Sequence, residues 1–108
     1  MLQVPQPPYP DGSGHHGRRV GVLVRRVQGK SMLPAFAPGR LILARSWFWR
    51  LKLGNVVVVR HQGLEKIKRV QQIDGDKVFL TGDNPVASTD SRQFGWVDRK
   101  QVIARVVL

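Results

Sequence analysis

The clearest pattern in this chain is a series of short β-branched runs separated by turn residues. Runs at 20–24, 40–45, 55–60 and 102–107 are rich in Val, Ile and Leu, a composition that favours strands over helices. The run at 55–60 contains four consecutive valines and is apolar enough to be covered on both faces. No segment has the period of a long helix. The pattern predicts a mainly β fold with few or no helices.

The segment at 64–73 is ambiguous, because its apolar residues recur every three positions, closer to a helical period than to a strand's. The Asp74-Gly75 dipeptide that follows favours a tight turn. We therefore interpret 64–73 as a strand that forms a hairpin with residues 77–80. In such a strand alternate residues share one face, here Lys66, Lys68 and Val70.

The first 18 residues differ in composition from the rest. They are rich in proline and glycine and cannot bury enough apolar surface to offset the entropy of ordering them. The whole chain has 108 residues, which leaves room for one modest core. We expect residues 1–18 to be a disordered tail and residues 19–108 to form one compact domain.

Several classes of site are excluded by composition. The chain has no cysteine, which removes disulfides, thiolate zinc sites and cysteine nucleophiles. His15-His16 lacks a third ligand and a rigid frame, so neither a metal nor another cofactor is expected. The longest aliphatic run is Val56-Val57-Val58-Val59, far short of the roughly 20 residues that cross a bilayer. Prolines near the start replace the apolar core of a secretory signal.

The charge is strongly positive, with 18 Lys and Arg against 7 Asp and Glu, and such an excess is a reason to consider nucleic acid or an anionic membrane. The basic residues are scattered, and no zinc-finger spacing or RNA-binding aromatic signature is present. A nucleic-acid partner is therefore not expected. A small basic β-barrel that binds nucleic acid is kept as the non-enzymatic alternative.

Trp47 and Trp49 lie in a stretch where aromatic residues alternate with cations. This arrangement suits peripheral contact with a membrane or a peptide-binding surface. The simpler interpretation is a partly buried connector at one end of the core.

Three separated segments could together supply a serine nucleophile and a lysine base. Ser31 lies in residues 29–34, Lys68 in the ambiguous strand, and a dense polar loop follows at 82–95. Serine is a weak nucleophile until a base takes its proton. Lysine can accept it only when burial lowers its ordinary pKa of about 10.4. We expect Val70 to dry the lysine's surroundings and Arg69 to disfavour a second positive charge.

These segments resemble the catalytic core of the signal peptidase I clan of serine–lysine peptidases. The resemblance covers about residues 22–108 and rests on the segments Gly29-Lys30-Ser31-Met32-Leu33-Pro34, Lys68-Arg69-Val70, Gly82-Asp83-Asn84 and Ser88-Thr89-Asp90-Ser91-Arg92 with Phe94-Gly95. It implies a compact β-barrel or coiled-β catalytic domain, in agreement with the strand pattern.

The resemblance also implies a role for individual residues. Ser31 would be the nucleophile, Lys68 the general base and Ser88 the group that orients the lysine. Asp90 and Arg92 would pair to hold the loop, and Asp83 and Asn84 would shape the same region. Next to the nucleophile, Met32 and Pro34 are candidates for the substrate pocket.

The chain departs from the clan's usual pattern in three ways. It shows no membrane-spanning segment, and only thirteen residues separate Lys68 from Gly82, which leaves no space for a second β-domain. Some members have an oxyanion-binding serine at the position of Gly29. The oxyanion would then rest on backbone N–H groups such as that of Ser31.

Short forms of the clan without a membrane span are similar to the maturation peptidases of nickel-type superoxide dismutase. We therefore expect a cytoplasmic endopeptidase whose partner is a precursor polypeptide with a short amino-terminal leader. The alternative is a membrane-associated leader peptidase of bacterial or mitochondrial inner-membrane type. A self-cleaving repressor is disfavoured, because the chain leaves no space for a helix-turn-helix domain.

Overall fold

The computed structural model describes residues 21–46 and 50–108. The expected tail at 1–18 lies outside these residues, as do Trp47 and Trp49. None of the helices among the described residues is long and apolar enough to cross a bilayer.

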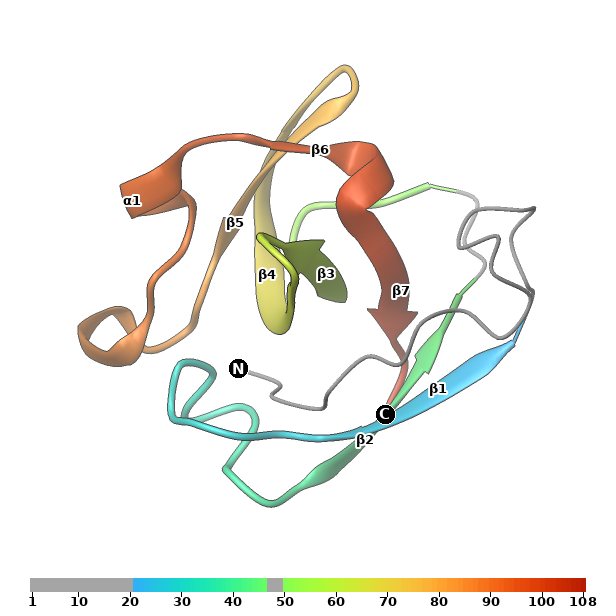
Figure 1. Ribbon diagram of the computed structural model, residues 1–108, viewed down its shortest axis with the longest axis vertical. Coiled ribbons are helices and arrows are strands. Elements are labelled where there is room, and N and C mark those ends of the chain that lie inside the picture. Colours follow the sequence, from blue (N-terminus) through green and yellow to red (C-terminus); the bar gives the residue numbers. More distant parts are fainter. Residues whose placement is uncertain (1–20, 47–49) are drawn as a thin grey trace.

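Seven strands form one antiparallel sheet in the order β1-β2-β7-β3-β4-β5-β6 (Figure 1). The strands are β1 (Val22–Arg26), β2 (Leu41–Arg45), β3 (Val56–His61), β4 (Leu64–Asp74), β5 (Lys77–Thr81), β6 (Val97–Asp98) and β7 (Val102–Val106). Three short helical elements lie in the second half of the chain, namely η1 (Pro85–Ala87), α1 (Ser91–Phe94) and η2 (Arg99–Gln101). The expectation of a mainly β domain with few helices is confirmed.

The first strand differs from its predicted position, since it runs from Val22 to Arg26 rather than over 20–24. The arginines belong to the strand because Arg25 and Arg26 pair with Ile42 and Leu41 of β2. Arg25 also reaches the buried carboxylate of Glu65, with Nε 2.8 Å from Oε1, so an ion pair joins β1 to β4.

The ambiguous segment is a strand, which confirms the hairpin interpretation. The first part of β4 pairs with β3 and its second part pairs with β5, with Arg69 paired to both neighbours. Asp74 pairs with Lys77, so the two central residues of the turn are Gly75 and Asp76 rather than Asp74 and Gly75. Gly75 has a φ of 58°, and glycine adopts a positive φ at this first central position without steric cost.

Two apolar clusters cover the two faces of the sheet, and β3 contributes to both. Val56 and Val58 lie in a cluster with Met32, whereas Val57 and Val59 lie in the cluster on the opposite face. All four valines are buried, which confirms that this strand is covered on both sides. Lys68 lies opposite Val57 in the β3–β4 register, so the sheet places its side chain on the face of the second cluster.

Candidate active site

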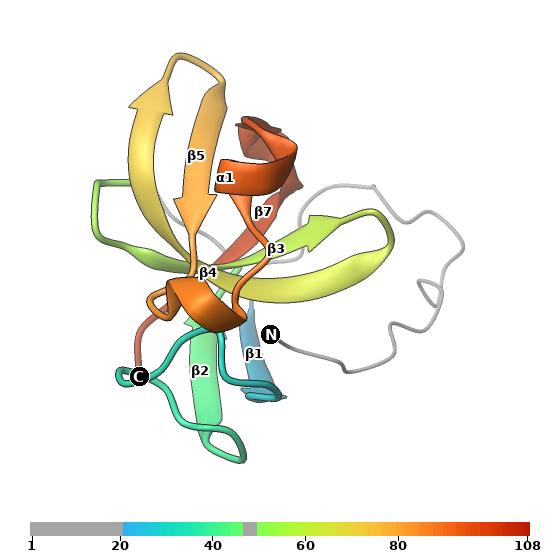
Figure 2. The same ribbon diagram turned by 90° about the vertical axis from the view of Figure 1, so that its left-hand side faces the viewer.

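Ser31 lies in the loop between β1 and β2, where it is 3% exposed. The neighbouring Met32 anchors the loop, because its side chain is buried in the first apolar cluster. The loop is also tied to the segment after β5. The backbone N–H of Asn84 donates to the Ser31 carbonyl at 2.8 Å, and the Asn84 side-chain amide donates to the Lys30 carbonyl at 3.0 Å. Figures 1 and 2 both place this loop beside η1.

Lys68 is 1% exposed and is held by a chain of hydrogen bonds. Its Nζ donates to Ser88 Oγ at 2.9 Å, and Ser88 Oγ donates to Asp90 Oδ2 at 2.6 Å. A hydroxyl has one proton, so the Ser88 proton is used on the carboxylate and its lone pair is left for the lysine. The order of these bonds fixes which way the Lys68 amine is turned.

Asp90 is fully buried, and its carboxylate accepts hydrogen bonds from several groups. Arg92 binds it with two nitrogens, Nη2 to Oδ2 at 2.6 Å and Nε to Oδ1 at 3.0 Å. The backbone N–H of Gly82 donates to Oδ2 at 2.7 Å. Asp90 also caps α1, where it forms a capping box with Gln93. The helix, the end of β5 and the Ser88 hydroxyl therefore converge on one carboxylate.

Gly82 lies between the serine loop and the lysine. A Cβ atom at this position would clash with Ser88 Oγ and would lie 2.7 Å from the Ser31 carbonyl oxygen. Ser31 and Ser88 thus flank the same point from two sides. Because Lys68 is hydrogen-bonded to Ser88, the serine loop and the lysine meet at Gly82. A glycine at the end of a strand is a known sign of close backbone approach, and this signal was not used in the sequence analysis.

Burial is the main influence on Lys68, and it lowers the pKa of the ammonium from 10.5 to about 8. Asp90 opposes this shift, whereas Lys66 and Arg92 reinforce it. Burial also disfavours the Asp90 carboxylate, but the bonds from Arg92, Gly82 and Ser88 outweigh it and hold the pKa of Asp90 below its usual range. The site therefore contains a carboxylate that stays ionised and an amine that is partly neutral near pH 8.

Arg69 does not act as predicted. Its side chain points away from the Lys68 face and forms an ion pair with Asp83, with distances of 2.8 and 2.7 Å. The cations that disfavour a charged Lys68 are Lys66 and Arg92. Sequence analysis chose the adjacent residue, but alternate residues on a strand share a face and adjacent ones do not. The observed pair gives Asp83 its structural task, since it fastens β4 to the segment that begins at Gly82.

The two pocket candidates have different environments. Met32 has no exposed surface in this arrangement, and its place in a substrate pocket stays a prediction. It is apolar and flexible enough to complete the core under the loop. Pro34 is exposed beside Ser31 and stays a candidate for substrate contact.

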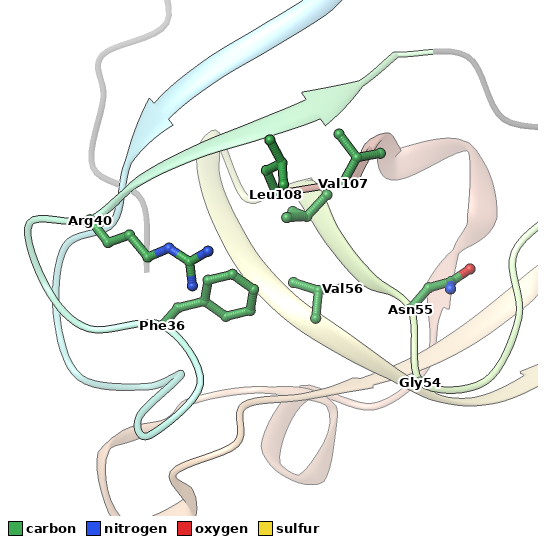
Figure 3. Close-up of a pocket in the computed structure, with 8 residues that line it drawn as sticks. Phe36, Arg40, Gly54, Asn55, Val56, Val107 and Leu108 are labelled. Carbon is green, nitrogen blue, oxygen red and sulfur yellow. The ribbon is translucent and has the colours of Figure 1, made fainter.

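A separate pocket of about 450 Å³ lies next to the first apolar cluster (Figure 3). It is lined by Phe36, Arg40, Gly54, Asn55, Val56, Val106, Val107 and Leu108. The Arg40 guanidinium lies 4.7 Å from the centre of the Phe36 ring, and Figure 3 shows the two side chains directed toward one another. No residue of the Lys68–Ser88–Asp90 chain lines this pocket. We therefore do not include the pocket in the candidate site.

Comparison with known proteins agrees with this geometry. Residues 8–107 match the Peptidase S24-like family. The chain belongs to this family. It is also similar to the mitochondrial ATP-independent inner membrane protease subunit 1a of Arabidopsis thaliana, with 31% identity over 123 residues, and the match covers 87% of this chain and 73% of that protein. The resemblance to signal-peptidase-like peptidases is confirmed, and the chain is a peptidase of this type.

We predict that Gly82→Ala destabilises the domain by about 1–3 kcal/mol, because the added methyl group would force apart the Ser31 carbonyl and Ser88. Urea unfolding would measure the loss. Gly21→Ala is the matched control, since a Cβ there meets no atom within 4 Å. Equal destabilisation by both changes would show that the close approach at Gly82 has no structural consequence.

We also predict that Lys68→Met stabilises the fold at pH 7. The folded-state pKa of about 8 lies below 10.5, so the buried ammonium opposes folding below pH 8, at a cost of at most about 3 kcal/mol. This penalty disappears as the pH rises from 8 to 10.5. Urea unfolding should show that Lys68→Met has a larger free energy of unfolding than the unaltered protein at pH 7, and that this difference is smaller at pH 10. A loss of stability at pH 7 would indicate that Lys68 has a structural role.

Proposed function

We propose that this protein is a serine endopeptidase in which Ser31 is the nucleophile and Lys68 the general base. The observation that carries the proposal is the Lys68–Ser88–Asp90 hydrogen-bond chain. It supplies a dry, oriented amine next to the loop that holds Ser31. Family membership supports peptidase chemistry. The proposal assigns that chemistry to Ser31 and Lys68.

In the proposed reaction, neutral Lys68 accepts the hydroxyl proton of Ser31 as its Oγ attacks the scissile carbonyl carbon. The amide C–N bond then breaks, and the Lys68 ammonium gives its proton to the departing amine. This leaves an ester on Ser31. A water molecule, deprotonated by the same lysine, hydrolyses that ester and frees the new carboxyl group.

Ser88 contributes by orientation. A neutral lysine has two N–H groups and one lone pair, and the bond to Ser88 uses one N–H. The lone pair can then point in another direction, and we propose that it points toward the hydroxyl of Ser31. The negative charge of the tetrahedral intermediate would rest on backbone N–H groups of the serine loop, among them that of Ser31.

The substrate is proposed to be an extended amino-terminal leader. Within residues 21–46 and 50–108, β1 is an edge strand of the sheet, and it leads directly into the loop of Ser31. An unpaired strand edge binds an extended peptide by main-chain hydrogen bonds, with shallow pockets for alternate side chains. The first candidate substrate is the precursor of a nickel-type superoxide dismutase. The second is a membrane-bound precursor, since the similar plant protein is named as an inner-membrane protease subunit.

We predict that Ser31→Ala and Lys68→Ala each reduce cleavage by about 10³-fold or more, because each removes a reacting group. Activity of the unaltered protein should rise with pH through the Lys68 pKa of about 8, since only the neutral amine accepts a proton. The measurement is single-turnover cleavage of a leader peptide between pH 6 and 10.

Lys66→Ala is the control for this experiment, as it changes a neighbouring lysine on the same strand. It should keep most of the activity at pH 9.5, where the base is largely neutral. If Lys66→Ala abolishes cleavage and Lys68→Ala remains active, the assignment of the base is wrong. A flat pH profile would also contradict it.

The substrate is tested by incubating the purified protein with the precursor of nickel-type superoxide dismutase, without detergent or lipid. We expect a shortened product whose new amino terminus can be determined by sequencing. Ser31→Ala is the negative control. Cleavage of a membrane-inserted leader alone would keep the peptidase assignment and shift the substrate to the second candidate.

A further inference from the structure

A second lysine, Lys66, lies on the same strand face as Lys68 and is 6% exposed. Two aromatic rings lie against its ammonium group. Its Nζ lies 4.8 Å from the centre of the Phe94 ring and 3.4 Å from His61 Nδ1, within hydrogen-bond distance. The rings of His61 and Phe94 stack with their centres 4.1 Å apart. β3 and α1 thus each contribute one ring to a cage beside the Lys66 ammonium of β4.

No carboxylate neutralises this ammonium within the described part of the chain, where Lys66 forms no ion pair. The adjacent Glu65 is buried on the opposite face and is bound by Arg25 at 2.8 and 3.1 Å. Burial lowers the pKa of Lys66, but the face of an aromatic ring favours the charged form of an amine. The cage therefore retains a positive charge without an acidic partner.

The position of Lys66 places this charge close to Lys68. The two residues are two positions apart on β4, which corresponds to roughly 6.6 Å along the strand. They lie opposite Val59 and Val57 of β3, and both valines belong to the second apolar cluster. Charges separated by apolar side chains interact more strongly than charges separated by water.

Other charged groups also face this region. Asp90 favours the charged form of Lys68, and Arg92 opposes it, but these two are bound to each other. On β7, Arg105 lies on the far side of Val57. On β3, burial and then Lys66 lower the pKa of His61, so its ring is neutral at neutral pH. Of the two cations that lower the pKa of Lys68, Arg92 is paired with Asp90, whereas Lys66 forms no ion pair within the described residues.

We propose that Lys66 is a positioning residue whose caged positive charge increases the fraction of Lys68 that is neutral at working pH. This role rests on the proposed function of Lys68 as the general base. Lys66 itself touches no reacting atom. Its removal should leave the reaction possible but move it to higher pH, which separates this role from a structural one.

The first experiment measures the titration of Lys68 directly, without catalysis. Lysine labelled with ¹³C at Cε is followed by NMR in the Ser31→Ala protein, with Lys68 assigned by the signal that Lys68→Met removes. Lys66→Met should raise the titration midpoint of Lys68 by about 0.5–1 pH unit. Lys66→Arg restores a cation and should leave the midpoint within about 0.3 of the original value. Lys100→Met, which removes an exposed charge elsewhere, should not move it.

The second experiment uses the unaltered Ser31 and measures the pH dependence of cleavage. Lys66→Met should lose about 3–10-fold at pH 7, as follows from that shift, and recover near pH 9.5. Lys66→Arg should follow the original profile.

The outcomes separate the two proposals. An unchanged Lys68 midpoint in Lys66→Met overturns this inference while the serine–lysine mechanism stands. Equal loss at every pH in both Lys66→Met and Lys66→Arg also overturns it, because the residue would then be structural. A shifted midpoint in a protein that cleaves no leader peptide would preserve the electrostatic coupling and remove the proposed function.

Discussion

The burial of one amine beside one hydroxyl is the constraint on which the rest of the site depends. Lys68 has almost no exposed surface and donates to Ser88 at 2.9 Å. A lysine in water is charged at neutral pH and cannot accept a proton. The fold therefore places this lysine in the middle of β4, opposite Val57, and surrounds it with the second apolar cluster. The position that destabilises the charged amine is the same one that suits it to the proposed role of base.

A buried lysine also requires an oriented partner, and orientation conflicts with neutrality. Ser88 is fixed by the carboxylate of Asp90, yet a carboxylate near a lysine favours the charged amine. Arg92 reduces the conflict, since it binds Asp90 through two nitrogens and itself disfavours a charged Lys68. The carboxylate keeps its hydrogen-bonding function, and its effect on the pKa of Lys68 is offset in part. Gly82 allows the arrangement, because a larger residue would separate Ser88 from the serine loop.

The positions of most strands could be predicted from the sequence. Runs of β-branched residues predicted β2, β3 and β7 closely, and the Asp-Gly dipeptide predicted the β4–β5 hairpin. The short elements after β5 were missed. α1 has four residues and owes its place to the Asp90 cap and to the stacking of Phe94 on His61. The stacking joins residues far apart in the chain, and no local period records it. The Asp90 cap is local, but a four-residue helix has too few residues to show a helical period. The expected influence of Arg69 on Lys68 was wrong because adjacent residues of a strand lie on opposite faces, and Arg69 pairs with Asp83 instead.

Lys66 shows how a local pattern can be correct while its meaning depends on tertiary contacts. Strand periodicity placed it on the Lys68 face, but a solvated lysine there would be screened by water and would matter little. The rings of His61 and Phe94 lie against the Lys66 ammonium, and the side chain is largely shielded from water. Its charge is therefore screened less, and no acidic side chain among the described residues pairs with it. Glu65 could have neutralised it, but the alternation of the strand turns that side chain toward Arg25 on the other face. Glu65 and Lys66 of β4 thus lie on opposite faces of the sheet. The face that contains Lys68 keeps the Lys66 charge, which disfavours the charged form of Lys68 and so supports the proposed role of its amine as a base.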